Sequence, residues 1–508
     1  MLELNKFTFM QLLLKTLGFG QFATAFSTIF VLRLRALVLL WREFCVTGST
    51  FRGCWNLAIP GEGERVIVLQ ERLNRFFERY YPDPIIFTIA LTFITIVICL
   101  IATDTSPSEV FTLWGDGLPS FLAFMAQLGL TLVFSHALAN TKPVASALSR
   151  LARIPSTAPQ AYLLVGLAGS GLSLITWSLG LVGGAIVAKA VASKASERAI
   201  GLNYPLLVAT AYAAMCLWHM GYSSSAAGYV AKDGHALEAQ MGIVPVSQTI
   251  FAHWNVAITL LSIIAICATA LVLGSKAPTT QLPQEDGPED EVEKESSPTP
   301  ADTVETSRLA TLLLATGIAA YLGLQALNGE LNLDLDTVNW TLLLATLLFV
   351  KSPRDLVEKI GRAGPVVTPI LLHYPFYAGM MALMMGSGLV AVFATGLVSH
   401  ASADTLPFFA FLSGGLLNVF VPSGGGQWVM QAPIFIEAAT ILGTPHEEIV
   451  MAIAYGDQWT NLVQPFWALP MLAIVGLKVR EVLGFCLFFL LSLGTVFGGG
   501  ILLVASMS

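Results

Sequence analysis

Two polar strings lie inside apolar stretches of the chain, and they hold the residues best suited to chemistry. The first is P-S-G-G-G-Q-W at 422–428, and the second is Y-G-D-Q-W-T-N at 455–461. Three consecutive glycines after Pro-Ser do not continue a regular helix comfortably. At membrane depth, broken backbone is tolerated only where it is buried in protein or lines a cavity. A helix broken there, beside amides, a hydroxyl and an acid, indicates a substrate site.

Asp457 is the only acid deep within a predicted membrane span. An isolated ionised carboxylate is costly in that position, so such a residue is usually functional or paired. Burial disfavours the charged form, so Asp457 could stay protonated and carry a coupling proton. It could instead be ionised against Na⁺ or a cationic partner. The competing interpretation is an acid that packs between helices and is hydrogen-bonded to its neighbours.

The glycine-rich strings are candidates for holding a carboxylate. Backbone N–H groups at a helix N-terminus, together with the helix dipole, suit an anion. Ser423 with Gly424, Gly425 and Gly426 could present such groups, and Ser178 with Gly183 and Gly184 could do the same in the first half of the chain. The alternative is close helix packing through small residues.

Amide side chains surround these strings. They are neutral and can both donate and accept, so they can orient a small polar ligand without a fixed charge. Bonding between helices is the competing role for each amide, and packing is the competing role for Trp459, a candidate pocket wall. The candidate substrate ligands are Ser178, Gly183, Gly184, Asn418, Ser423, Gly424, Gly425, Gly426, Gln427, Gln458, Trp459, Asn461 and Gln464, with Asp457 as the ion-coupling residue.

Other chemistry finds little support in the sequence. His136, His219 and His373 fall in predicted spans, where a hydrogen-bonded core histidine is the favoured interpretation over a proton relay. The six cysteines are scattered and form no C-x-x-C, and no set of His, Cys and acids has metal spacing. We expect no cofactor, no metal, no nucleic-acid partner and no enzymatic activity, since neither a nucleophile elbow nor a phosphate-binding loop is present.

Composition places these residues in a membrane. The chain has 508 residues, 55% of them hydrophobic and 12% charged, about half the charged fraction of a soluble domain. Apolar runs of about twenty residues recur, the length that crosses hydrocarbon. The prediction is an all-α polytopic protein with about nine to eleven transmembrane helices and two re-entrant hairpins.

The predicted hairpins are two apolar segments of awkward length, near 161–192 and near 406–436. Each is too long for one upright span and too short for two. Basic loops flank the first segment on both sides, and basic short loops mark the cytoplasm. The first hairpin should therefore enter from the cytoplasm and turn near Trp177–Gly184, and the second should enter from outside.

The two halves can be aligned on each other. T-W-S-L-G-L-V-G-G-A from Thr176 lies on N-V-F-V-P-S-G-G-G-Q from Asn418, which places Gly183 and Gly184 on Gly425 and Gly426. The positive-inside rule gives the two halves opposite orientations in the membrane. Inverted repeats with discontinuous helices are typical of secondary transporters, although a coincidence of glycine-rich helices is the alternative.

Domain boundaries follow from composition. Residues 1–65 form an N-terminal extension of uncertain role. The first membrane repeat covers 66–273 and the second covers 309–508. Between them, 274–308 is acidic and proline-rich, and such a composition cannot bury enough surface to fold. We expect it to be a cytoplasmic linker.

The chain resembles the short-chain fatty acid transporter family, the uptake permeases for acetoacetate and butyrate. The resemblance rests on P-S-G-G-G-Q-W and on A-Y-G-D-Q-W-T-N-L-V-Q-P-F-W-A-L-P, and it extends from about Arg72 to the C-terminus. Shorter matches are Y-P-D-P-I-I-F, L-W-G-D-G-L, N-Y-P-L-L-V-A and H-Y-P-F-Y-A-G. It implies a bacterial inner-membrane carrier of short-chain monocarboxylates, akin to ion transporters built from inverted repeats and paired hairpins.

We therefore expect secondary active transport of butyrate, acetoacetate and similar monocarboxylates across the cytoplasmic membrane. The coupling ion would be H⁺, or alternatively Na⁺, and the carrier could be a homo-oligomer. A carrier of the same architecture for a dicarboxylate or an amino acid is one alternative. A channel or a non-transporting sensor is another.

Overall fold

The computed structural model describes residues 72–73, 75–77, 79–275, 277–280, 299–329, 331 and 334–507. Within these ranges the chain is helical and contains no strand. The predicted extension at 1–65 and most of the predicted linker at 274–308 lie outside the described residues.

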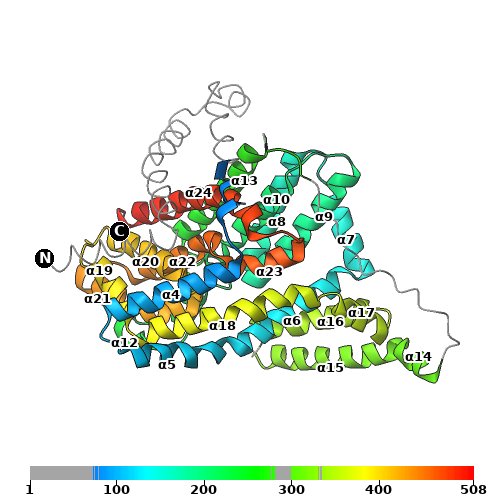
Figure 1. Cartoon of the computed structure of the whole chain (residues 1–508), viewed down its shortest axis with the longest axis horizontal. Coiled ribbons are helices and arrows are strands. Elements are labelled where there is room, and N and C mark those ends of the chain that lie inside the picture. Colours follow the sequence, from blue (N-terminus) through cyan, green and yellow to red (C-terminus); the bar gives the residue numbers. More distant parts are fainter. Residues whose placement is uncertain are drawn as a thin grey trace. The chain divides into compact units, whose positions relative to one another are not determined.

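The described helices make this a multi-pass membrane protein. Eight helical runs are long and apolar enough to cross a bilayer, and four shorter apolar helices accompany them. The sequence predicted nine to eleven crossings. Helices α4 (Pro84–Ala102), α5 (Pro107–Gly117), α18 (Gly364–Gly386) and α24 (Val479–Ala505) run in broadly similar directions across Figure 1. Helix α18 packs on both α4 and α5.

The helices of the first half are separated by short turns. In the labels used here, η marks a 3₁₀ or π turn. They are α4 (Pro84–Ala102), α5 (Pro107–Gly117), η1 (Leu118–Phe121), α6 (Leu122–Ala139), α7 (Lys142–Ala152), α8 (Ala158–Ile175), η2 (Leu179–Gly183), α9 (Gly184–Glu197), α10 (Tyr204–Met215), η3 (Trp218–Met220), α11 (Ser225–Val230), α12 (Glu238–Met241) and α13 (His253–Gly274).

The second half continues after the linker. Its helices are α14 (Pro300–Glu305), α15 (Arg308–Leu327), α16 (Leu335–Phe349), α17 (Pro353–Gly361), α18 (Gly364–Gly386), α19 (Leu389–Val398), α20 (Leu406–Asn418), α21 (Gly424–Leu442), α22 (His446–Thr460), η4 (Asn461–Val463), α23 (Pro465–Val475) and α24 (Val479–Ala505).

Local sequence explains many helix starts. A short polar side chain followed by proline begins several helices, because the side chain accepts an otherwise unpaired N–H and proline needs none at the first helical position. Asp83 accepts from Ile85 N at 3.0 Å, and Asn203 accepts from Leu206 N at 2.9 Å. Helix α14 begins with a full capping box between Thr299 and Asp302.

The segment 158–197 folds back on itself. Helices α8 and α9 pack together, and the Arg198 guanidinium donates to the carbonyls of Arg153 (2.9 Å) and Pro155 (2.7 Å), so both arms end at the same place. This pairing of arms agrees with a hairpin. Entry into the membrane from one side stays a prediction.

The turn of this hairpin lies earlier than the sequence predicted. The chain reverses at Thr176, whose φ of −156° and ψ of 142° are extended, and Gly180 already lies in the π turn η2. The glycines serve close packing here. A Cβ on Gly180 would lie 2.8 Å from Ser173 Cα, and one on Gly183 would lie 2.9 Å from Leu172 Cδ1. The break at Thr176 directly precedes the stretch Trp177–Gly184 near which the sequence predicted the turn, and Gly184 begins α9.

The segment 406–442 folds back in the same way. Helices α20 and α21 pack on each other, and Thr444 Oγ1 donates to Ala403 O at 3.1 Å at their shared open end. The tip is the non-helical stretch 419–423. Ser423 then caps α21, accepting from Gly426 N at 3.3 Å. Gly425 and Gly426 therefore lie in the first turn of α21. Their predicted counterparts differ, because Gly183 ends the π turn η2 and Gly184 begins α9.

Two long apolar runs of the sequence are interrupted. The run 205–229 breaks between α10 and α11, and the run 449–477 breaks between α22 and α23. The second break has a simple cause, since the residue before a proline is pushed out of the helical region. Gln464 precedes Pro465 and has φ −106° and ψ 144°.

Candidate functional site

The tips of the two predicted hairpins both contact the interrupted segment 218–225 of the first half. The first tip is the turn at Thr176, and the second tip is the stretch 419–423 with Gly424. At the first tip, Leu174 O accepts from Tyr222 N at 2.8 Å, and Ser223 Oγ accepts from Trp177 N at 3.0 Å. At the second tip, a Cβ on Gly424 would lie 2.6 Å from His219 Nε2 and 2.7 Å from Ser225 Oγ. The two predicted hairpins thus meet at one broken helix.

Asp457 is paired with a histidine. His219 Nε2 lies 2.9 Å from Asp457 Oδ2, and the two residues come from opposite halves of the chain. His219 is fully buried and Asp457 is 2% exposed. His219 Nδ1 lies 3.2 Å from Ser224 Oγ, and the backbone N–H of His219 donates to Gln458 Oε1 at 3.0 Å. The sequence prediction left Asp457 without a named partner.

Three predicted amides form one buried network at the second break. Asn461 Oδ1 accepts from Asn418 Nδ2 and from Gln464 Nε2, both at 2.8 Å. Asn418 Nδ2 also donates to Thr460 Oγ1 at 3.0 Å, and the Tyr212 hydroxyl donates to the Asn461 carbonyl at 2.7 Å. Helices α10, α20 and α22 are joined through this network.

Buried polar atoms without a partner gather around these groups. Buried donors and acceptors are nearly always satisfied, so a concentration of open ones points to a missing ligand. Among the described residues these atoms are Asp457 Oδ1, Gln458 Nε2, Ser225 Oγ, Asn418 Oδ1, Asn461 Nδ2 and Gln464 Oε1. The set offers donors and acceptors but no fixed positive charge.

The N-terminus of α21 lies beside the same groups. The first N–H groups of a helix have no intrahelical partner. Ser423 Oγ accepts that of Gly426, which leaves the N–H groups of Gly424 and Gly425 at the positive end of the helix dipole. This end can receive a carboxylate.

Some predicted residues lie elsewhere. The Trp459 indole donates to Leu490 O at 2.7 Å, and its ring centroid lies 4.9 Å from that of Phe411. Trp459 thus packs between helices. Gln427 donates to Gly414 O across the second hairpin. Ser178 is buried beside Thr176, with 3.3 Å between their hydroxyls. Substrate binding by these residues, and by Gly183 and Gly184, stays a prediction.

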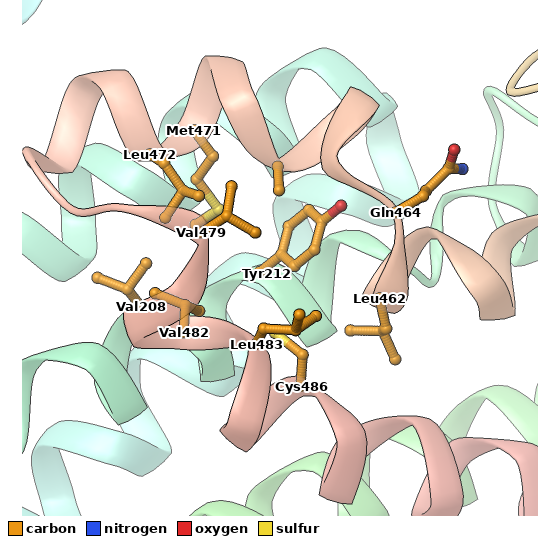
Figure 2. Close-up of a pocket in the computed structure, with 11 residues that line it drawn as sticks. Val208, Tyr212, Leu462, Gln464, Met471, Leu472, Val479, Val482, Leu483 and Cys486 are labelled. Atoms are coloured by element: carbon orange, nitrogen blue, oxygen red, sulfur yellow. The ribbon is translucent and has the colours of Figure 1, made fainter. Parts of the chain in front are cut away.

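A narrow apolar cavity adjoins the amide network. It has a volume of about 10 Å³ and is lined by aliphatic side chains of α10, α23 and α24 with Tyr212, Gln464 and Cys486. Figure 2 shows Tyr212 among the apolar side chains, with Gln464 at the edge and its amide directed away from them. A cavity of this size holds about one water molecule.

Aromatic rings pack at the first tip. The Trp177 ring lies 5.0 Å from that of Trp467 and 6.3 Å from that of Phe124, and Tyr374 stacks 4.0 Å from Phe466. The other rings come from α6, α18 and α23 and pack around the first tip. Their stacked and edge-to-face arrangements are the ones that aromatic pairs favour.

Sequence reasoning missed Ser224, Ser225 and Tyr212, and it favoured a core role for His219. The run Tyr222-Ser223-Ser224-Ser225 after Gly221 was a signal for a break in the helix, because short hydroxyl side chains compete for backbone partners. His219 lay three residues before that run. The partner 238 residues away is a tertiary contact that no local pattern reveals.

Among the described residues, no group of three or more His, Cys, Asp or Glu side chains could hold a metal ion. The four cysteines described, Cys99, Cys216, Cys267 and Cys486, are free and buried.

Helices that cross the membrane, interrupted spans and a buried polar centre define a membrane transporter rather than an enzyme. A family model described as "Short chain fatty acid transporter" matches residues 66–504. The chain belongs to this family, and the resemblance read from the sequence is confirmed.

Two curated relatives agree. Each carries the name "Putative short-chain fatty acid transporter". The protein from Escherichia coli (strain K12) is 38% identical over 437 residues, covering 85% of this chain and 98% of its own. The protein from Haemophilus influenzae (strain ATCC 51907 / DSM 11121 / KW20 / Rd) is 35% identical over 436 residues, covering 84% and 97%.

Solved structures share less. The YdaH transporter of Alcanivorax borkumensis aligns with a TM-score of 0.41 and 16% identity, covering 84% of this chain and 98% of its own. MtrF of Neisseria gonorrhoeae, described as illuminating a class of antimetabolite efflux pumps, aligns with a TM-score of 0.38 and 14% identity. The alignment covers 84% of this chain and 96% of MtrF.

Proposed function

We propose that this transporter carries butyrate, acetoacetate and similar short-chain monocarboxylates across the cytoplasmic membrane by proton symport. The family supports the substrate class. The observation that carries the proposal is the convergence of two helical tips and two interrupted helices on open polar atoms around Asp457. The cluster of open polar atoms around Asp457 is large enough for one carboxylate. Because the described residues of this cluster include no Lys or Arg side chain, it offers no partner for a second carboxylate.

The substrate carboxylate would lie at the N-terminus of α21, close to Gln458 and Ser225. Free N–H groups and the helix dipole stabilise an anion there. The alkyl end would extend past Asn461 and Gln464 toward the apolar cavity. Since that cavity holds about 10 Å³, it must widen when substrate binds. Each CH₂ buried adds about 0.8 kcal/mol, so cavity depth would set the preferred chain length.

Asp457 would couple the proton to the substrate. It lies in α22, and its unpartnered oxygen adjoins the proposed carboxylate position. Lys478 precedes α24 and Arg480 lies in its first turn, so the positive-inside rule would place the cavity toward the cytoplasm. The two halves would be inverted repeats, each with a re-entrant hairpin, and alternating access would follow from their relative movement.

Uptake into proteoliposomes tests the proposal. Labelled acetoacetate and butyrate are supplied while pH and Na⁺ gradients are imposed separately, with protein-free liposomes to measure passive entry of the protonated acids. We expect saturable uptake, counterflow between the two substrates, and accumulation driven by an inward proton gradient alone. Accumulation that requires Na⁺ would contradict proton coupling. Currents without saturable counterflow would identify a channel instead.

A further inference from the structure

We infer that His219 and Asp457 act as one proton-binding unit, which holds one proton without substrate and two with it, so that one H⁺ enters with each monocarboxylate. This inference rests on the proposed function and names a residue and a stoichiometry for it. His219 is then part of the coupling site and not a core histidine.

The geometry joins the two groups and isolates them from water. Their polar atoms are 2.9 Å apart, and the side chains are 1% and 3% exposed. His219 belongs to the break of the first half and Asp457 to α22 of the second. The second tip rests directly on the pair, because a Cβ on Gly424 would overlap His219 Nε2.

Charge balance sets the number of protons. An isolated charge is strongly disfavoured in a buried site, whereas a pair of zero net charge is tolerated when hydrogen-bonded. One shared proton gives the empty pair zero net charge, whether it resides on the imidazole or on the carboxylate. A substrate carboxylate at the N-terminus of α21 adds one negative charge. A second proton on the pair restores neutrality.

The surroundings can accommodate both states. Asp457 Oδ1 has no partner among the described residues, so it has room for a proton. Ser224 Oγ, 3.2 Å from His219 Nδ1, can donate to an unprotonated nitrogen or accept from a protonated one. In the transport step, a proton from outside binds the pair as the anion binds, and both leave to the cytoplasm. No other bond changes.

Few other groups near the pair could take this proton. Cys216, directly after α10, interacts electrostatically with Asp457. Tyr212 of α10, Tyr455 of α22 and Cys486 of α24 are further buried titratable groups. Thiols and phenols are uncharged near pH 7. Helix α20, which packs most extensively on α22, has no titratable side chain. Tyr229 of α11 and Glu437 of α21 lie on further helices packed against the pair's elements. Tyr162 of α8 and His253 and Cys267 of α13 lie on helices that pack against η3, and Arg480 and Glu481 lie at the start of α24.

His219→Gln and Asp457→Asn test the unit. Both substitutions keep hydrogen-bonding capacity but remove a titrating group. The matched control is His373→Gln, since His373 is also a buried span histidine, yet its Nδ1 bonds the Pro369 carbonyl at 2.7 Å and it pairs with no acid. Proteoliposomes with a trapped pH dye report acetoacetate counterflow, proton entry and accumulation on the same preparation.

We expect counterflow to persist in His219→Gln, while accumulation driven by a pH gradient falls at least tenfold and substrate-dependent proton entry disappears, because Asp457 alone cannot hold two protons. In Asp457→Asn the imidazole is neutral without substrate and takes one proton with it, so one proton per acetoacetate should still enter. His373→Gln should match the wild type. The wild type should take up one proton per acetoacetate, and an imposed membrane potential should not change its accumulation.

His219→Gln that concentrates acetoacetate with unchanged proton entry would overturn the inference and leave the proposed function standing. Wild-type accumulation that follows the membrane potential would overturn the one-to-one stoichiometry, and this measurement needs no variant to fold. Absence of saturable acetoacetate uptake in the wild type would instead refute the proposed function.

Discussion

At the scale of single residues, glycine and amide side chains determine what the center can hold. Gly424 directly follows the second tip and lies against His219. A side chain at this position would overlap the imidazole, since an added Cβ would lie 2.6 Å from His219 Nε2. Asn461 uses its oxygen twice within the protein and leaves its nitrogen open. Such half-used groups are costly when buried, which makes them candidates for contact with a ligand.

Gly424→Ala should abolish transport, and the adjacent Gly425→Ala should not. The added methyl would lie 2.6 Å from His219 Nε2, whereas at position 425 the nearest atom, Ser225 Cβ, is 3.8 Å away. Overpacking of this kind costs roughly 1–3 kcal/mol, here at the coupling pair. Acetoacetate uptake by the two purified variants gives the comparison. Equal activity would show that the second tip does not rest on His219 during transport.

Gln464→Ala should weaken substrate binding, whereas Gln431→Ala should not. Both glutamines are buried and each has one open amide atom, but Gln431 accepts from Ser413 Oγ within the second hairpin, away from the amide network. Loss of one ligand hydrogen bond, about 0.5–1.5 kcal/mol, should raise the half-saturation concentration for acetoacetate several-fold. An unchanged value in Gln464→Ala would remove this residue from the site.

The sequence predicted the polar residues better than it predicted their contacts. Asn418, Gln458, Asn461, Gln464 and Asp457 were all singled out as buried polar groups, and all are buried. Their residue types within apolar stretches are a local property of the sequence. The pairing of Asp457 with His219 depends on how distant helices pack, and no local pattern encodes it.

At the scale of elements, interruptions matter as much as helices. Apolar length predicted the spans, but helix breaks inside them were missed at 216–224 and at 461–464. The second was readable, because Pro465 forces Gln464 out of the helix. The first depends on a tertiary contact, since Tyr222 N bonds Leu174 O of the first tip. The first turn was predicted near Trp177–Gly184, and the break lies at Thr176, directly before that stretch.

Gly221→Ala should destabilise the contact between the first tip and the first break. Its Cβ would lie 2.2 Å from Leu174 O and 2.5 Å from Leu174 Cα, both backbone atoms that cannot move aside cheaply. We expect a thermal midpoint several degrees lower in detergent. Gly228→Ala is the control, because nothing lies within 4 Å of its added Cβ, and alanine favours the helix by about 0.5–1 kcal/mol. Equal midpoints would contradict the close approach at Gly221.

At the scale of the whole molecule, loop charge and sequence repetition predict two inverted halves. Helices and their packing agree with two hairpins whose arms each share an open end. Sidedness depends on the bilayer and follows from the positive-inside rule alone. The family model matches residues 66–504, and the predicted extension at 1–65 stays a prediction.

Opposite sidedness of the two hairpins can be measured with single cysteines. Thr157 and Ala403 are exposed residues at the open ends of the first and second hairpins. The four described native cysteines are buried, and Cys45 and Cys54 are replaced by serine in the background. An impermeant maleimide should label Thr157→Cys in inverted vesicles and Ala403→Cys in spheroplasts, because Arg153, Lys194 and Arg198 hold the first open end in the cytoplasm. Detergent-solubilised samples, where both sites should react, are the control for reactivity. Labelling of both positions from one side would refute inverted repeats, since two hairpins entering from the same side cannot belong to halves of opposite orientation.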